Sequence, residues 1–213
     1  MPNTFTTLLN LPPNTTNGVD MSHYNTNVDW PAIVAAGVQF VYIKVSDGIG
    51  TPDTAANQHA ADAKANNMQI GYYHFCRPKT RGETIEDAGI AEAQDTANLL
   101  AELPPADLPL VLDLEATVPV NVLSPDDYLS WVHSYIGALP AGTNVMIYTN
   151  KDYIDTVIPA SHDLGQYPLW LARYNQDCNN AICPVGWADW NIWQFEGSGV
   201  LGGNNPIDLD IMK

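Results

Sequence analysis

The alternation of strand-like and helix-like segments constrains the fold of this chain more than any other feature. From residue 18 onward, short runs of aliphatic, β-branched and aromatic residues alternate with segments that carry helix caps or helix-stopping prolines. We expect eight strands, over residues 18–22, 40–46, 70–75, 110–115, 144–148, 169–173, 192–196 and 207–211. Eight strands that alternate with helices favour a closed β/α barrel.

Five of the intervening segments carry the signals of helices. Asp29 and Ser124 are predicted N-caps, and each is followed by a proline in the first helical turn. We expect the helices from Asp29 to Gly37, over about 54–66, over about 83–103, from Pro125 to about residue 139, and over about 151–157. The fold class is therefore α/β, a modified TIM-like β/α barrel that loses its helices toward the C-terminus.

One domain accounts for nearly all of the chain. Residues 1–17 are rich in Asn, Thr and Pro and lack hydrophobic periodicity, so we expect an N-terminal arm before a single barrel domain over residues 18–213. No apolar run reaches the roughly 18 residues of a membrane span. The first residues also lack the basic and apolar regions of a signal peptide, so none is visible in this chain.

The charge of the chain restricts its partners. It has 8 basic and 24 acidic residues, and its net charge is −16. Nucleic acid is excluded as a partner, because phosphate binding needs clustered Lys and Arg, and anionic membrane surfaces are disfavoured for the same reason. Solubility is one explanation of the acidity, and a cleft lined by carboxylates is another.

The three cysteines leave one question open. Cys178 and Cys183 flank a short polar loop and are close enough in sequence to form a disulfide, which would leave Cys76 unpaired. Whether they are bridged cannot be deduced from the spacing alone. No Cys/His spacing suggests zinc, and we expect neither a metal nor a cofactor.

Two acids end the fourth predicted strand. Asp113 and Glu115 follow the apolar run 110–112, and they share one face because side chains alternate along a strand. Two carboxyls so close cannot easily both ionise in a dry cleft, so one pKa should rise. Cleavage of a glycosidic bond needs this difference, since one carboxyl donates a proton while another stays charged.

Two further acids lie at matching positions. Asp20 is in the first predicted strand and Asp208 is in the last, where it shares a face with Asp210. Because the first and last strands adjoin when a barrel closes, Asp20 and Asp208 should be neighbours. For each acid alone, a solvated strand end is the alternative. Together the acids predict one pocket at the C-terminal ends of the strands, where barrel active sites lie.

Aromatic residues near the strand ends fit a sugar-binding pocket. Flat rings stack on sugar faces and bury apolar area, although core packing is the alternative for each residue. The candidates for substrate binding are Tyr73, Tyr148, Trp170, Tyr174 and Trp193. His74 is interpreted as a structural, hydrogen-bonded histidine. Lys44 is expected to point into the barrel, where it would need acids as counter-ions.

In their order and spacing, these motifs resemble family 25 of the glycoside hydrolases, the Chalaropsis-type lysozymes. The resemblance runs from about residue 18 to residue 211. The motifs that carry it are GVDMS at 18–22, VDW at 28–30, FVYIK at 40–44, GYYHF at 71–75, PLVLDLE at 109–115, IYT at 147–149, LWLARY at 169–174, WQ at 193–194 and IDL at 207–209. One departure is Asp47, within Ser-Asp-Gly, where family members often carry Thr-Glu-Gly, so Asp47 is left out of the catalytic set.

The resemblance implies an activity and roles for the acids. It implies hydrolysis of the β-1,4 bond between N-acetylmuramic acid and N-acetylglucosamine in peptidoglycan, by a single catalytic domain without a metal or cofactor. Glu115 would be the general acid, and Asp113 would orient the acetamido oxygen of the substrate for attack on the anomeric carbon. Asp20 and Asp208 match the remaining acids of the pocket. We expect a monomer that acts on cell-wall glycan strands outside the cytoplasm.

Two other classes of protein remain as alternatives. A chitinase-like hydrolase also carries Asp-x-Glu at a strand end, but further aspartates usually precede it at alternate positions, and here Val111 stands in that place. A glycan-binding barrel without catalysis is the second alternative. The presence of Glu115 together with the three aspartates argues against it.

Overall fold

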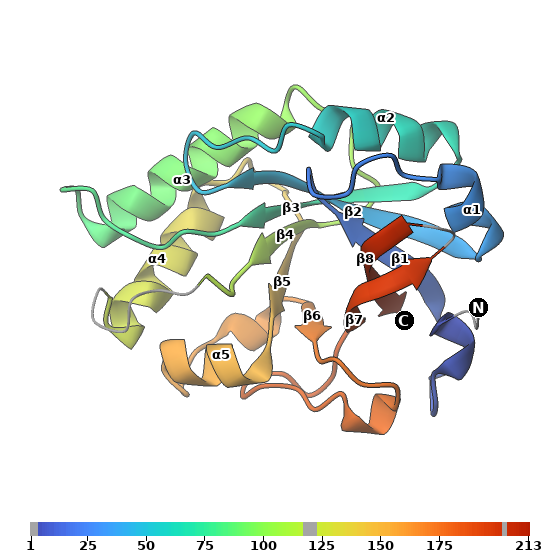
Figure 1. Ribbon diagram of the computed structural model, residues 1–213. Helices are drawn as coiled ribbons and strands as arrows, with labels where there is room; N and C mark the ends of the chain where they lie inside the picture. Colours follow the sequence, from blue (N-terminus) through green and yellow to red (C-terminus); the bar gives the residue numbers. More distant parts are fainter. Residues whose placement is uncertain (1–3, 117–122, 202–203) are drawn as a thin grey trace.

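The structure is a computed structural model that describes residues 4–116, 123–201 and 204–213. Eight strands form one closed barrel in sequence order, which confirms the predicted fold class (Figure 1). The strands are β1 (Thr16–Met21), β2 (Val38–Asp47), β3 (Gln69–Phe75), β4 (Leu110–Asp113), β5 (Val145–Thr149), β6 (Leu169–Ala172), β7 (Ile192–Leu201) and β8 (Asn204–Met212).

The last strand distinguishes this barrel from a regular TIM barrel. Neighbouring strands from β1 to β7 are parallel, whereas β8 is antiparallel to both β7 and β1. The reason is the connection, because β7 ends at Leu201 and β8 begins at Asn204. A parallel crossover needs a dozen or more residues. The connection between β7 and β8 is much shorter, so these two strands can pair only in the antiparallel direction.

The five α-helices lie between the first six strands, which confirms the predicted loss of helices toward the C-terminus. They are α1 (Trp30–Ala35), α2 (Ala56–Ala65), α3 (Ile85–Leu100), α4 (Pro125–Ala138) and α5 (Lys151–Val157). Short 3₁₀ helices are η1 (Thr4–Thr7), η2 (Leu164–Gln166) and η3 (Cys178–Asn180). The Asp29 side chain accepts from the Ala32 N–H at 3.1 Å, and Ser124 forms a capping box with Asp127, so both predicted N-caps are confirmed.

Several boundaries differ from the predicted ones. The third helix ends at Leu100, three residues before the predicted end. β1 begins at Thr16, inside the predicted arm, of which residues 1–3 lie outside the described part of the chain. β4 ends at Asp113, so Glu115 follows the strand, although the Leu114 N–H still donates to the Tyr148 carbonyl at 2.9 Å.

The N-terminal segment covers a side of the barrel that has no helix. The Phe5 ring in η1 packs edge-on against Phe195 of β7, with ring centroids 5.7 Å apart. The Leu9 N–H donates to the Gln176 carbonyl at 2.8 Å, and the Leu9 carbonyl accepts from the Cys178 N–H at 3.0 Å. Figure 1 shows this segment beside β7 and β8. It therefore buries apolar surface where a later helix would do so in a regular barrel.

The barrel interior is filled by aromatic rings below the C-terminal ends of the strands. Tyr42 and Trp170 have ring centroids 4.7 Å apart, and Tyr148 lies edge-on to Trp170 at 5.0 Å. Phe40 adds a ring that fits because its neighbour Gly18 has no side chain. These rings form a packed floor beneath the C-terminal ends of the strands. No helix of the described residues is long and apolar enough to span a bilayer.

We predict that Gly18→Ala destabilises the fold. A Cβ at Gly18 would lie 2.0 Å from Cζ of Phe40, whose ring is fully buried. Overpacking of this kind costs about 1–3 kcal/mol, which urea unfolding would measure. Gly137→Ala is the control, because Gly137 is exposed on α4 and a Cβ there meets nothing within 4 Å. Alanine is also about 1 kcal/mol more favourable than glycine in a helix. Equal unfolding free energies for the two variants would contradict the prediction.

Candidate active site

A pocket of about 190 Å³ opens at the C-terminal ends of the strands. Its lining contains the four predicted acids and three of the predicted aromatic residues, namely Asp20, Asp113, Glu115, Asp208, Tyr73, Tyr148 and Trp170. A larger cavity of about 310 Å³ lies at the opposite end, around the loop before β4. The one acid in that larger cavity, Asp107, pairs with Lys64, so the concentrated acidic chemistry lies in the smaller pocket.

Barrel closure brings the acids of the first and last strands together. Asp20 on β1 lies directly opposite Asp208 on β8 in the antiparallel register, as the sequence analysis expected. Burial, followed by the charge of Asp20, raises the pKa of Asp208 to about 9. Asp208 is therefore protonated near neutral pH and can act as a hydrogen-bond donor on this side of the pocket.

Asp113 and Glu115 form the other side of the pocket. Both side chains reach the pocket, which agrees with their predicted common face. Burial raises the pKa of both carboxyls, and the charge of Glu115 raises the pKa of Asp113 further, while Lys44 opposes the increase at both. A proton on one of the two carboxyls removes the repulsion between them. Asp113 Oδ1 is buried and has no hydrogen-bond partner among the described residues.

Lys44 is the cation that lines the same pocket, and a three-residue ion-pair group holds it. Lys44 Nζ donates to Asp47 Oδ2 at 3.1 Å, and Arg77 Nε donates to Asp47 Oδ1 at 2.6 Å. Burial raises the pKa of Asp47, but the hydrogen bonds from Arg77 and Lys44 outweigh it and hold that pKa below its usual value. The counter-ion of Lys44 is thus Asp47, whose carboxylate also binds Arg77.

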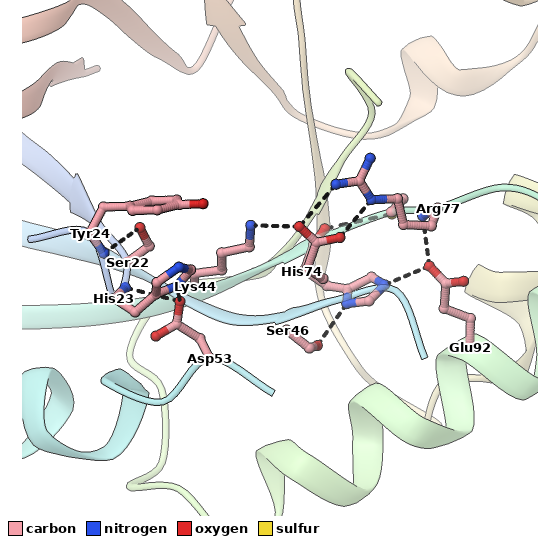
Figure 2. Close-up of polar contacts among 11 residues, drawn as sticks. Ser22, His23, Tyr24, Lys44, Ser46, Asp53, His74, Arg77 and Glu92 are labelled. Carbon is pink, nitrogen blue, oxygen red and sulfur yellow. Dashed lines mark hydrogen bonds and ion pairs between the residues drawn. The ribbon is translucent and has the colours of Figure 1, made fainter. Parts of the chain in front are cut away.

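His74 belongs to a buried polar chain behind the pocket, as the sequence analysis expected. Its Nδ1 lies 2.8 Å from Ser46 Oγ and its Nε2 lies 2.9 Å from Glu92 Oε1. The Arg77 N–H also donates to Glu92 Oε1 at 2.8 Å (Figure 2). These contacts connect β2 and β3 to α3. They also hold the backbone that carries Lys44, Asp47 and Arg77. The side chains of Ser46, His74 and Glu92 are fully buried, so they do not contact a ligand.

Sequence reasoning gave no role to Gln194, which is the centre of the polar network. Gln194 Nε2 donates to Asp20 Oδ2 at 2.7 Å, and Gln194 Oε1 accepts from the hydroxyls of Tyr148 at 2.8 Å and Tyr174 at 3.2 Å. Tyr174 itself is 61% exposed and lies at the rim, outside the lining of the pocket. The signal that could have identified Gln194 is its place beside Trp193, because neighbours in a strand face opposite sides.

The expected contact of Trp193 with substrate is wrong. Trp193 is fully buried on the outer side of β7, with ring centroids 6.0 Å from Trp190 and 5.7 Å from Phe195. Its Nε1–H donates to the Arg173 carbonyl at 2.7 Å. Since Gln194 faces the barrel interior, alternation along the strand turns Trp193 away from the pocket.

The rim of the pocket contains a second group that sequence reasoning missed. Tyr24 lines the pocket and is 79% exposed, and its ring lies 4.0 Å from that of His23. His23 Nδ1 lies 2.7 Å from Asp53 Oδ2, a buried carboxylate that fixes the imidazole (Figure 2). The position of Tyr24, two residues after Ser22 in the first strand motif, was the available signal.

The pocket suits an uncharged ligand with hydrogen-bonding groups rather than a metal or an anion. Among the described residues, no three His, Cys, Asp or Glu side chains are grouped so that they could hold a metal ion. The pocket instead offers a proton donor, a carboxylate and aromatic rings.

Cys178 and Cys183 are free thiols in the structure, and burial raises the pKa of each.

A barrel that carries such a carboxyl pair at the C-terminal ends of its strands has the active-site arrangement of a glycoside hydrolase. The chain belongs to the glycosyl hydrolases family 25, whose model matches residues 19–204.

Relatives of known structure or name support this assignment. Over 197 residues the chain is 26% identical to Lysozyme M1 of Streptomyces globisporus, covering 87% of this chain but 63% of that protein, so it spans less than two thirds of the length of this relative. It is 29% identical to N,O-diacetylmuramidase of Arthroderma benhamiae, covering 89% of this chain and 80% of the relative. The family GH25 lysozyme from Aspergillus fumigatus has a TM-score of 0.79 at 27% identity, with 94% of each chain covered.

We predict that Lys44→Met shifts the pH–rate profile upward. The charge of Lys44 lowers the pKa of Asp113 and Glu115, so its loss raises both and moves both limbs of kcat/KM to higher pH, by about one unit. Hydrolysis measured across the pH range, with the melting temperature followed in parallel, tests this. Lys64→Met, which removes a surface lysine paired with Asp107, should leave the profile in place. An unmoved profile for Lys44→Met would show that its charge does not act on the pair.

Proposed function

We propose that this protein is a muramidase that hydrolyses the β-1,4 bond between N-acetylmuramic acid and N-acetylglucosamine in peptidoglycan. The carboxyl pair Asp113–Glu115, buried beside Lys44 in a family 25 barrel, is the observation that carries this proposal. Relatives with the names lysozyme and N,O-diacetylmuramidase support the substrate class. Family membership also favours this activity over a chitinase-like one.

Glu115 is the general acid in this proposal. Burial raises its pKa and so favours the protonated carboxyl, which can donate its proton to the leaving sugar oxygen. Its position just after β4 places the carboxyl at the open end of the barrel, where a glycosidic bond can reach it. Nearby carboxylate charge then stabilises the developing oxocarbenium ion.

Asp113 orients the substrate's own nucleophile. Its unpaired Oδ1 is an acceptor that the N–H of an acetamido group can satisfy, and this hydrogen bond turns the acetamido oxygen toward the anomeric carbon. Transfer of the Glu115 proton to the leaving group allows Asp113 to stay charged beside the cyclised intermediate. Asp20 and Asp208 form the opposite, largely neutral side of the pocket, and protonated Asp208 can donate to the substrate.

Aromatic residues hold the sugar rings. Tyr73, Tyr148 and Trp170 line the pocket, while Tyr24 and Tyr174 offer exposed rings at its rim. Stacking on the accessible rings of Tyr24, Tyr73 and Tyr174 binds an uncharged sugar without the lysines and arginines that this acidic chain largely lacks, while the buried rings of Tyr148 and Trp170 form the floor below. The proposed partner is a glycan strand of the cell wall, on which the protein acts outside the cytoplasm and as a monomer.

We predict that Glu115→Gln folds normally and loses activity by about 10²–10⁴-fold, because glutamine keeps the shape of the side chain but has no acidic proton. Turnover of purified peptidoglycan and the melting temperature measure the two effects separately. Glu102→Gln is the control, since it makes the same change at an exposed position after α3. If Glu115→Gln retained more than about a tenth of wild-type turnover, Glu115 would not be the acid.

A further prediction tests substrate assistance. Peptidoglycan that lacks the acetyl group on the sugar preceding the cleaved bond should resist hydrolysis while it still binds. The reason is that an amine has no carbonyl oxygen to attack the anomeric carbon, and its positive charge opposes the oxocarbenium ion. Each 1.36 kcal/mol added to the barrier costs about tenfold in rate. Turnover and binding on matched acetylated and deacetylated glycans decide the question. Equal turnover, or a trapped sugar–aspartate adduct, would make an aspartate the nucleophile instead.

A further inference from the structure

A fifth acid, Asp210, lies below the pocket and is not exposed to solvent. Asp210 is fully buried on β8, two residues after Asp208. In the antiparallel register it lies opposite Gly18 of β1. Its Oδ1 accepts from the indole N–H of Trp170 at 2.8 Å. Its Oδ2 is buried and receives no hydrogen bond from an N–H group or a hydroxyl of the described residues. The group beside Asp210 that could satisfy this oxygen is the carboxyl of Asp20.

Two carboxylates cannot satisfy each other, because an ionised carboxylate only accepts hydrogen bonds. Asp20 Oδ2 already accepts from Gln194 Nε2 at 2.7 Å. The contact between the two buried carboxyls becomes favourable when one proton lies between them, since this removes a charge and fills the orphaned acceptor. We propose that Asp20 and Asp210 share one proton, and that Asp210 is a positioning residue that keeps Asp20 neutral beneath the pocket.

The electrostatic surroundings of the two acids support this arrangement. Burial and the charge of Asp210 raise the pKa of Asp20, and the hydrogen bond from Gln194 offsets only part of this increase. Burial and the charge of Asp208 also raise the pKa of Asp210, but its hydrogen bonds with Trp170 and Asp20 lower it. Burial therefore favours one bound proton on the pair, and in this proposal Asp20 carries that proton and Asp210 accepts it.

The pair connects two residues that line the pocket. Trp170 donates to Asp210, Asp210 accepts from Asp20, and Asp20 accepts from Gln194, which in turn holds the Tyr148 hydroxyl. This chain crosses β6, β8, β1, β7 and β5, so the shared proton connects side chains from five strands around the pocket. A neutral Asp20 also places no negative charge against Glu115, with which it interacts.

Several other groups face the pair and share its electrostatic field. Those that can titrate are Tyr42 on β2, Tyr73 on β3, Asp113 on β4, Glu115 after β4, Tyr148 on β5, Tyr174 after β6 and Asp208 on β8, and the cation that lines the pocket is Lys44. Burial raises the pKa of each of these tyrosines, so they stay neutral. The carboxyls and Lys44 are thus the groups whose charge changes can follow from an altered Asp20.

The substitution Asp210→Asn tests the shared proton. Asparagine can accept from Trp170 through its oxygen and donate to Asp20 through its nitrogen, so Asp20 no longer needs a proton and ionises. The new charge raises the pKa of Glu115, and the basic limb of kcat/KM should move to higher pH by about one unit. Glu102→Gln, which removes an exposed charge at the far end of α3, should leave the profile unchanged.

A direct proton count complements the kinetics, because the pH profile rests on the proposed function and the count does not. NMR of protein labelled with ¹³C at the aspartate side-chain carboxyls reports which aspartates are protonated at pH 7. We expect one fewer protonated aspartate in Asp210→Asn than in the wild type. Asp20→Asn should give the same loss, since its amide can donate to Asp210, and it serves if Asp210→Asn does not fold. An unchanged count in the variants, or an ionised Asp20 in the wild type, would overturn the inference, whether or not the protein hydrolyses peptidoglycan.

Discussion

The crowding of carboxyl groups at one end of the barrel is the constraint on which the rest of this structure depends. Asp20, Asp113 and Asp210 are buried there, and Glu115 and Asp208 lie beside them. Full ionisation would place several negative charges in a poorly solvated space, so protons stay bound and the pKa values rise. The proton that an acid catalyst needs is thus retained by the site as a whole.

Two of the eight Lys and Arg residues, Lys44 and Arg77, lie near this cluster and limit the effect. Lys44 reaches the pocket and lowers the pKa of Asp113 and Glu115, and Asp47 together with Arg77 fixes its position. This separates the pocket into two electrostatic halves. The charge of Lys44 favours a carboxylate in its half, whereas Asp208 in the half formed by β1 and β8 is protonated near neutral pH. In the proposed reaction, a sugar between the two halves meets a proton donor, an acceptor and flat rings.

The antiparallel last strand makes the neutral half possible. β8 pairs with β1 over five residues, and this register sets Asp208 against Asp20 and Asp210 against Gly18. Asp210 extends toward Asp20 and Trp170, its partners below the pocket, while the Phe40 ring fills the space beside Gly18. The same short connection that prevents a parallel crossover therefore builds the acid cluster. The N-terminal segment, through Phe5, covers β7 where the barrel has no helix.

The sequence by itself determined the architecture and much of the pocket. The alternation of strands with capped helices predicted the barrel, the period of two predicted a common face for Asp113 and Glu115, and closure of the barrel predicted Asp20 near Asp208. Only the tertiary structure decided that Trp193 faces outward. It also decided that Arg77 binds Asp47 and that Gln194 binds Asp20. Periodicity tells which side chains share a face within one strand. The contacts between strands depend on register and closure of the barrel, which packing of the whole chain sets.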